Sequence, residues 1–69
     1  MPRLNAEALL RAMRRRNVLF KHQLANAAGI SYDRLAELFA HPEREVDEDT
    51  VARLSGALGC EPGEITSRE

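Results

Sequence analysis

Residues 23–35 read Gln23-Leu24-Ala25-Asn26-Ala27-Ala28-Gly29-Ile30-Ser31-Tyr32-Asp33-Arg34-Leu35. In this stretch the small side chain of Ala25 lets a second helix cross close to the first. Gly29 can adopt the left-handed backbone conformation that ends a helix and forms a turn. Ile30 then fills the angle between the helices, and Ser31 is a favoured N-cap residue. The stretch therefore predicts two short helices joined by a tight turn, a helix-turn-helix.

The two helices of this motif are expected over residues 21–28 and 31–40. The second is amphipathic, and Pro42 ends it near Ala40. Its inward face consists of Leu35, Leu38 and Phe39. Its outward face consists of Tyr32, Asp33, Arg34, Ala36 and Glu37.

One amphipathic helix is expected before the motif, over residues 6–16, where Asn5 can act as its N-cap. Its apolar residues recur at the spacing of one helix face. They are Ala6, Leu9, Leu10 and Met13. Residues 1–4 precede this helix and are expected to fray.

Two further helices are expected after the motif. Asp47 is a good N-cap for a helix over residues 48–58, and Pro62 suits the first turn of a last short helix. Residues 67–69 are expected to fray. No strand pattern competes with this organisation, so the sequence predicts a single all-α domain of five helices over residues 1–69.

The length and the few potential ligands exclude several classes of protein. A chain of 69 residues makes a domain of marginal stability with little room for a buried catalytic cleft. The single Cys60 cannot form an internal disulfide, and with His22 and His41 it fits no tetrahedral zinc site. No apolar run approaches the ~20 residues that a membrane span needs. We expect no cofactor, no metal, no small-molecule ligand, no membrane partner and no enzymatic activity, because a nucleophile–base pair and a phosphate-binding loop are missing.

The charged residues are distributed unevenly along the chain. Residues 1–24 hold six basic residues and one acidic residue, whereas residues 25–69 hold four arginines and ten acidic residues. A basic half can supply the phosphate-directed field that DNA binding needs, although an arginine-rich helix can also be a solvated surface.

The central motif resembles the phage repressor/Cro-type, or XRE-type, helix-turn-helix family, whose pattern is a Leu-Ala pair followed by Gly, an aliphatic residue and Ser. Residues 24–25 and 29–31 match this pattern. A second, separate stretch looks like the family's fourth helix and closing turn. It consists of residues 46–51, Leu54 and residues 57–65. The resemblance covers nearly the whole chain and implies a compact, lambda-repressor-like five-helix bundle that binds double-stranded DNA in the cytoplasm of a bacterial cell or a phage-infected host.

The resemblance also implies roles for particular residues, with helix 31–40 lying in the major groove. The base-reading candidates are Tyr32, Asp33, Arg34 and Glu37. The phosphate-binding candidates are Arg14, Lys21, His22, Ser31 and Arg44. Lys21 stands where the family often has a Gln that contacts phosphate. The family's counterpart of Arg14 commonly pairs with a Glu, which is replaced here by Phe39 and so leaves Arg14 available for phosphate.

Alternatives stay open for the charged residues near this face. Asp33 and Glu37 would meet a polyanion, where either can accept a hydrogen bond from cytosine N4. Asp33 can instead cap or charge the start of its helix, and Glu37 can pair with Arg34 or Arg44. The arginines at 14–16 either flank the DNA or form a solvated helix end.

The sequence as a whole favours a sequence-specific transcription regulator, a repressor or Cro-like switch protein. The alternative is a protein-interaction module on the same fold, antitoxin-like or sequestering a regulator, which the acidic residues of 25–69 would suit. One recognition helix reads few bases, so two copies are expected on DNA. We expect a monomer or weak homodimer in solution that pairs on DNA through residues 62–65 and the end of helix 48–58.

Overall fold

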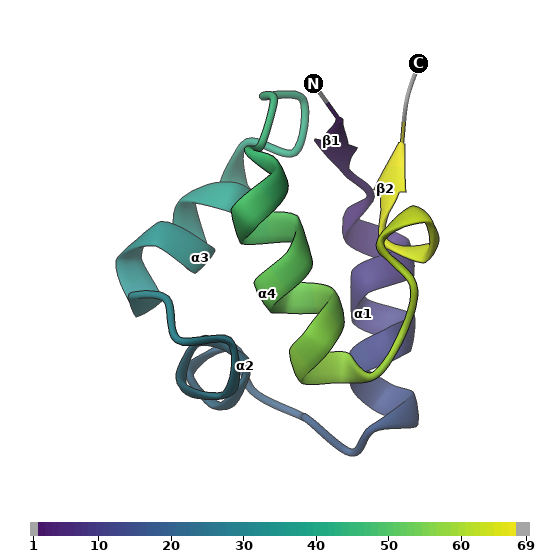
Figure 1. Ribbon diagram of the computed structural model, residues 1–69. Coiled ribbons are helices and arrows are strands. Elements are labelled where there is room, and N and C mark those ends of the chain that lie inside the picture. Colours follow the sequence, from purple (N-terminus) through teal and green to yellow (C-terminus); the bar gives the residue numbers. More distant parts are fainter. Residues whose placement is uncertain (1, 68–69) are drawn as a thin grey trace.

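The computed structural model describes residues 2–67, in which four α-helices surround one core. These helices are α1 (Ala6–Arg15), α2 (Lys21–Ala28), α3 (Tyr32–Ala40) and α4 (Glu48–Leu58). A 3-10 helix, η1 (Pro62–Glu64), follows α4, and two short strands, β1 (Arg3–Leu4) and β2 (Thr66–Ser67), lie at the two ends of the chain. Figure 1 shows α4 in the middle, with α1 on one side of it and α3 on the other.

The expected count of five helices is wrong, although the helical class and the helix-turn-helix are present. Only the four elements above are α-helices within residues 2–67, and the fifth is the single 3-10 turn η1. The physical reason is space, because three residues separate Glu61 from Ile65 and the chain then enters β2. A helix this short cannot complete α-helical hydrogen bonds.

The expectations that no strand forms and that both ends fray are also wrong within the described residues. β1 and β2 pair antiparallel, with Arg3 opposite Ser67 and Leu4 opposite Thr66. Leu4 is buried in the core. Two-residue strands are too short for alternation to be visible in a sequence. Met1, Arg68 and Glu69, for which fraying was also expected, lie outside the described residues.

The core draws fully buried side chains from all four α-helices and from the segments before and after α4. Its largest members are Leu9, Leu24, Leu35, Val46, Leu54, Leu58 and Ile65. On α1 the buried residues are Ala8, Leu9, Ala12 and Met13, whereas Leu10 is 38% exposed. The expected apolar stripe is therefore wrong at Ala6 and Leu10, whose places in the buried face are taken by Ala8 and Ala12. Small alanine side chains carry this part of the interface.

The helix starts and ends follow the local sequence. Asn5, Ser31 and Asp47 each accept a hydrogen bond from the backbone amide three residues ahead, which confirms all three expected caps. Gly29 and Gly59, with φ of 73° and 64°, end α2 and α4 in the left-handed conformation. These local interactions place α2 and α3 on either side of one tight turn.

Candidate nucleic-acid interface

The turn between α2 and α3 holds the two helices at a close crossing. Ala25 is 2% exposed, and its carbonyl oxygen accepts hydrogen bonds from the amides of Gly29 (2.9 Å) and Ile30 (3.1 Å). Ile30 is partly buried against the core. The guanidinium of Arg53 on α4 lies beside this turn, because a Cβ at Gly29 would be 3.3 Å from Arg53 Nη1. The sequence motif therefore positions α3 on the side of the molecule away from α1.

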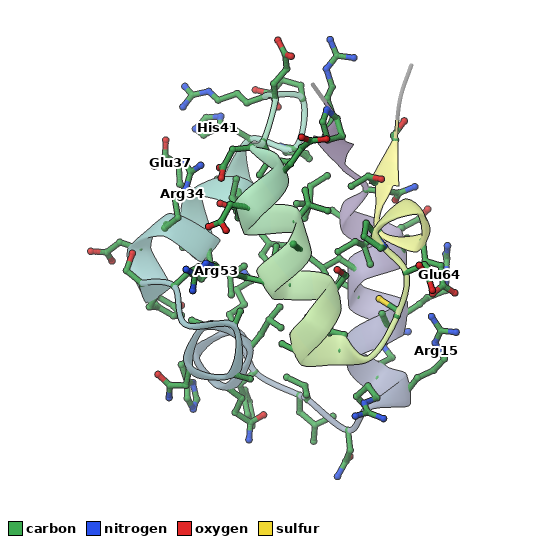
Figure 2. The ribbon with its side chains drawn as sticks, viewed as in Figure 1. Arg15, Arg34, Glu37, His41, Arg53 and Glu64 are labelled. Atoms are coloured by element: carbon green, nitrogen blue, oxygen red, sulfur yellow. The ribbon has the colours of Figure 1, made fainter. Side chains whose placement is uncertain are left out.

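The two faces of α3 differ sharply in exposure. Leu35 and Leu38 are 0% and 5% exposed, and Phe39 packs against the core from the last turn. All four base-reading candidates are exposed: Tyr32, Asp33, Arg34 and Glu37. Figure 2 shows Arg34, Glu37 and His41 on the side formed by α3, opposite Arg15 and Glu64. α3 thus presents a polar, solvent-facing surface on a rigid apolar base.

The phosphate-binding candidates lie in four parts of the fold. These are the start of α2 (Lys21 and His22), the N-cap of α3 (Ser31), the connection to α4 (Arg44) and the end of α1 (Arg14). Lys21 begins α2, and its Nζ lies 4.9 Å from the centre of the Phe39 ring, a cation–π contact that brings this ammonium next to the end of α3. The imidazole of His22 stacks on Phe20, with ring centres 5.7 Å apart. Arg14 is exposed in the last turn of α1 and has no ion pair within residues 2–67.

The arginines at 15 and 16 point to a different part of the molecule. Arg15 Nη2 lies 4.0 Å from Glu64 Oε1, on the side away from α3 (Figure 2). The guanidinium of Arg16 lies beside Gly59 at the end of α4. Both arginines line a hollow of about 260 Å³ together with Cys60. Burial, together with the nearby Glu64 carboxylate, raises the pKa of the Cys60 thiol.

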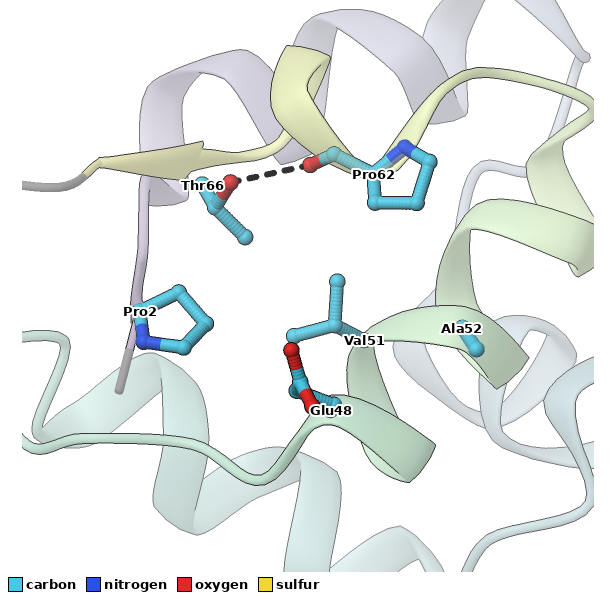
Figure 3. Close-up of a pocket in the computed structure, with 6 residues that line it drawn as sticks. All are labelled: Pro2, Glu48, Val51, Ala52, Pro62 and Thr66. Carbon is cyan, nitrogen blue, oxygen red and sulfur yellow. Dashed lines mark hydrogen bonds between the residues drawn. The ribbon is translucent and has the colours of Figure 1, made fainter.

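A second hollow lies at the start of α4, where the chain ends meet η1. It has a volume of about 130 Å³, and Figure 3 shows its lining residues. They are Pro2, Glu48, Val51, Ala52, Pro62 and Thr66. No group of three His, Cys, Asp or Glu side chains in the described part of the chain could hold a metal ion. None of the described helices is long and apolar enough to cross a membrane.

Arginine–carboxylate pairs connect α3 to the segment that leads into α4. Arg44 Nη1 lies 3.0 Å from Glu37 Oε1, and Arg34 Nη2 lies 3.3 Å from Asp47 Oδ1. Glu37 therefore pairs with Arg44 rather than Arg34. Asp33 is not the cap of α3, because Ser31 is, and it lies in the first turn, where its charge complements the helix dipole.

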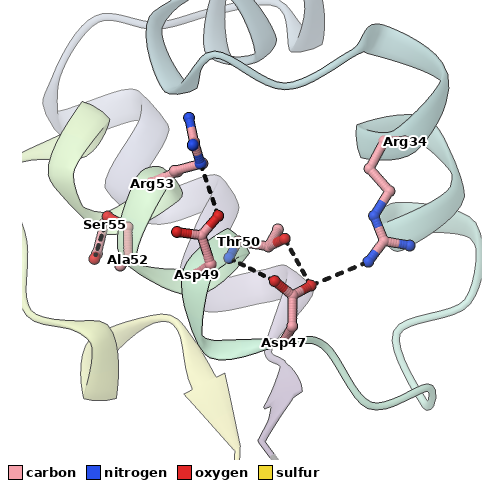
Figure 4. A network of polar contacts seen from close by, with 7 residues as sticks. All are labelled: Arg34, Asp47, Asp49, Thr50, Ala52, Arg53 and Ser55. Atoms are coloured by element: carbon pink, nitrogen blue, oxygen red, sulfur yellow. Dashed lines mark hydrogen bonds and ion pairs between the residues drawn. The ribbon is translucent and has the colours of Figure 1, made fainter.

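Asp47 is the centre of the polar network shown in Figure 4. Its carboxylate accepts hydrogen bonds from the Thr50 hydroxyl (2.7 Å) and the Thr50 amide (3.1 Å). These bonds, with a smaller contribution from the positive charge of Arg34, lower the pKa of Asp47. On the same helix Arg53 Nε donates to Asp49 at 2.9 Å, and this carboxylate raises the pKa of Arg53.

Sequence reasoning assigned Asp47 only as a helix cap and did not single out Arg53. The four-residue spacing between Asp49 and Arg53 was visible as a helical ion pair. The contact between Arg34 and Asp47 spans 13 residues and depends on the angle between α3 and α4. No sequence pattern indicates it.

A family model described as the Cro/C1-type HTH DNA-binding domain matches residues 8–69. The chain belongs to the Cro/C1-type HTH DNA-binding domain family. The match includes α2, the turn, α3 and α4, and it confirms the family that the sequence motif indicated. The Cro/C1-type domain binds DNA and acts in transcription regulation. Searches of curated proteins and of solved structures return no match.

Proposed function

We propose that this Cro/C1-type domain is a sequence-specific transcription regulator, a repressor or Cro-like switch protein, that reads the major groove with α3. The supporting observation is the division of α3 into a buried apolar face and an exposed polar face. The major groove is wide enough to admit an α-helix, and base edges there present a distinct pattern of donors and acceptors. On this proposal the protein regulates by occupying DNA and catalyses no reaction.

Each exposed side chain of α3 has chemistry suited to a base edge. Arg34 can donate two hydrogen bonds to guanine O6 and N7, and Tyr32 can donate its hydroxyl proton. The carboxylates of Asp33 and Glu37 can accept from cytosine N4. Ser31 accepts from the amide of Arg34, which leaves its hydroxyl proton for a phosphate oxygen.

Phosphate contacts are proposed for side chains at the start of α2, in the connection from α3 to α4 and at the end of α1. Lys21 and His22 lie in the first turn of α2, where the unpaired backbone amides of a helix start favour an anion. Arg44 lies between α3 and α4, and Arg14 lies at the end of α1. These contacts would orient the domain on the duplex and carry no sequence information.

The test is binding to a random pool of duplex DNA across a series of salt concentrations. A log–log plot of affinity against salt should be steep for the wild-type protein. Lys21→Ala and Arg14→Ala should each reduce the slope by about one. Arg15→Ala removes the same charge on the side away from α3 and should leave the slope unchanged. Affinity that is independent of salt would overturn the proposal.

Two copies of the domain are proposed to occupy one operator, on half-sites about 34–36 Å apart. The proposed contact is residues 62–65, which include η1, with the exposed end of α4. Such a patch is smaller than the ~1,000 Å² of a stable interface, so the free protein should be a monomer or weak dimer. Sedimentation at micromolar concentration that shows a tight dimer would contradict this proposal.

A protein-interaction role is the second candidate, and the connection into α4 is the observation that favours it. Its exposed carboxylates are Glu43, Glu45, Glu48 and Asp49. Exposed carboxylates weaken attraction to a polyanion and would suit a basic protein surface. Failure to bind random duplex DNA even at low salt would favour this role over DNA reading.

A further inference from the structure

We propose that Asp47 determines the base specificity of Arg34 by holding its guanidinium in one orientation against the start of α4. The inference rests on the proposed function, because it assumes that α3 reads bases. Asp47 itself would act through Arg34, as a positioning residue, and would not contact a base.

The carboxylate of Asp47 is itself held in place. Its Oδ2 accepts the Thr50 amide at 3.1 Å and its Oδ1 accepts the Thr50 hydroxyl at 2.7 Å. Thr50 is only 7% exposed and belongs to the first turn of α4, so this turn is anchored on the core. Two hydrogen bonds from one buried residue leave the carboxylate little rotational freedom.

Arg34 reaches this fixed carboxylate without becoming buried. Its Nη2 donates to Asp47 Oδ1 at 3.3 Å, while its side chain is 43% exposed. A guanidinium carries five N–H donors, so one bond to Asp47 leaves other donors for a bidentate contact with guanine. A pre-oriented guanidinium also loses less conformational entropy on binding in that orientation.

The other ion pairs near α3 lack this arrangement. Glu37 holds Arg44, but its carboxylate has no further hydrogen bond within the described residues. Asp49 holds Arg53 along the same helix, and its side chain is 74% exposed. Among the arginines on the α3 side, Arg34 is therefore paired with a carboxylate that a buried residue fixes.

Removing the Asp47 carboxylate would change which groups of the DNA the Arg34 guanidinium contacts. An unrestrained guanidinium can turn to any nearby phosphate, and such contacts are equally available on every sequence. Loss of the carboxylate should therefore strengthen binding to random DNA and weaken discrimination at the base pair that Arg34 reads.

The experiment compares Asp47→Ser with Asp49→Ser in the full chain. Both variants remove one carboxylate in or next to the first turn of α4, and serine at 47 remains a good N-cap. Thermal unfolding checks that both variants fold. The measurement is the ratio of two dissociation constants. The denominator is the constant for the site selected by the wild-type protein. The numerator is the constant for the same site changed at the base pair whose preference Arg34→Ala abolishes.

We expect Asp47→Ser to lower this ratio by at least about 5-fold, the low end of a bidentate base contact. Asp49→Ser should lower it by less than about 2-fold, because it leaves the Arg34–Asp47 contact intact. In an Arg34→Ala background, adding Asp47→Ser should leave the ratio unchanged, since the residue that it positions is already gone.

Equal effects of the two serine variants, or an undiminished effect of Asp47→Ser in the Arg34→Ala background, would overturn this inference alone. An Arg34→Ala variant that keeps every base preference would overturn it as well. A wild-type protein that binds DNA without any sequence preference would overturn the proposed function together with the inference.

Discussion

α3 is nine residues long, and its inner and outer faces have different roles. The inner face contributes to stability, and the outer face is proposed to recognise DNA. The inner face, with Leu35 and Leu38, is buried in the core, and α3 packs against α2. The outer face exposes Tyr32, Asp33, Arg34 and Glu37. Arg34 pairs with the Asp47 carboxylate, and the Glu37 carboxylate pairs with Arg44. Because the helical repeat separates the faces, stability and recognition depend on different residues of one element.

The largest expected effect is on the inner face. Leu35→Ala should lower the free energy of unfolding by about 2–5 kcal/mol, because it leaves a cavity at a site with no solvent exposure. A domain this small has roughly 3–5 kcal/mol in total, so the variant should be largely unfolded. Tyr32→Ala on the outer face should change stability by less than about 0.5 kcal/mol. Urea denaturation followed by circular dichroism measures both, and similar losses for the two variants would contradict the separation of the faces.

A substitution at Gly29 should affect both the stability of the inner face of α3 and DNA binding by its outer face. Gly29→Ala places a side chain at φ 73° and 3.3 Å from Arg53 Nη1, so it should destabilise by about 1–2 kcal/mol. Any movement of the turn would also shift α3 relative to α2 and weaken DNA binding. Gly56→Ala is the control, since its Cβ meets open space within α4 and should stabilise by about 0.5–1 kcal/mol. Thermal unfolding in which Gly29→Ala is as stable as Gly56→Ala would show that the turn tolerates a side chain.

The Asp47 cap at the start of α4 should make the smallest contribution to stability, and this contribution depends on pH. Asp47 has a lowered pKa in the folded protein, so its bonds to Thr50 and Arg34 stabilise the fold above the ordinary Asp pKa of about 4. This contribution is lost as the pH falls through the lower pKa of the folded state. Asn caps a helix about as well and does not titrate, so Asp47→Asn should lose less stability than the wild type between about pH 5 and 2. Parallel melting-temperature curves for the two proteins would contradict this assignment.

Much of the inner face could be predicted because its determinants are local. Ser31, Gly29 and the helical spacing of Leu35 and Leu38 act within a few residues of each other, and each has one dominant physical role. The match to residues 8–69 then confirmed the family that this stretch resembles. The exposed positions of Tyr32 and Asp33 followed from the same helical period.

The remainder depends on contacts between distant parts of the chain. The pairing of β1 with β2 joins residues at opposite ends of the sequence, and neither strand is long enough to show alternation. The contact of Arg34 with Asp47 and the position of the Arg53 guanidinium beside Gly29 depend on how α4 crosses the motif. The ion pair of Arg15 with Glu64, on the side away from α3, also depends on where the fold places η1 relative to the end of α1.

The central claim is that the outer face of α3 reads bases, and the most direct test is selection of preferred sequences from a random duplex pool. The wild-type protein should enrich one sequence, and Tyr32→Ala, Arg34→Ala and Glu37→Ala should each relax the preference at particular positions by roughly 1–3 kcal/mol. Lys21→Ala should weaken binding to all sequences alike. An unchanged sequence preference in all three α3 variants would contradict the placement of α3 in the major groove.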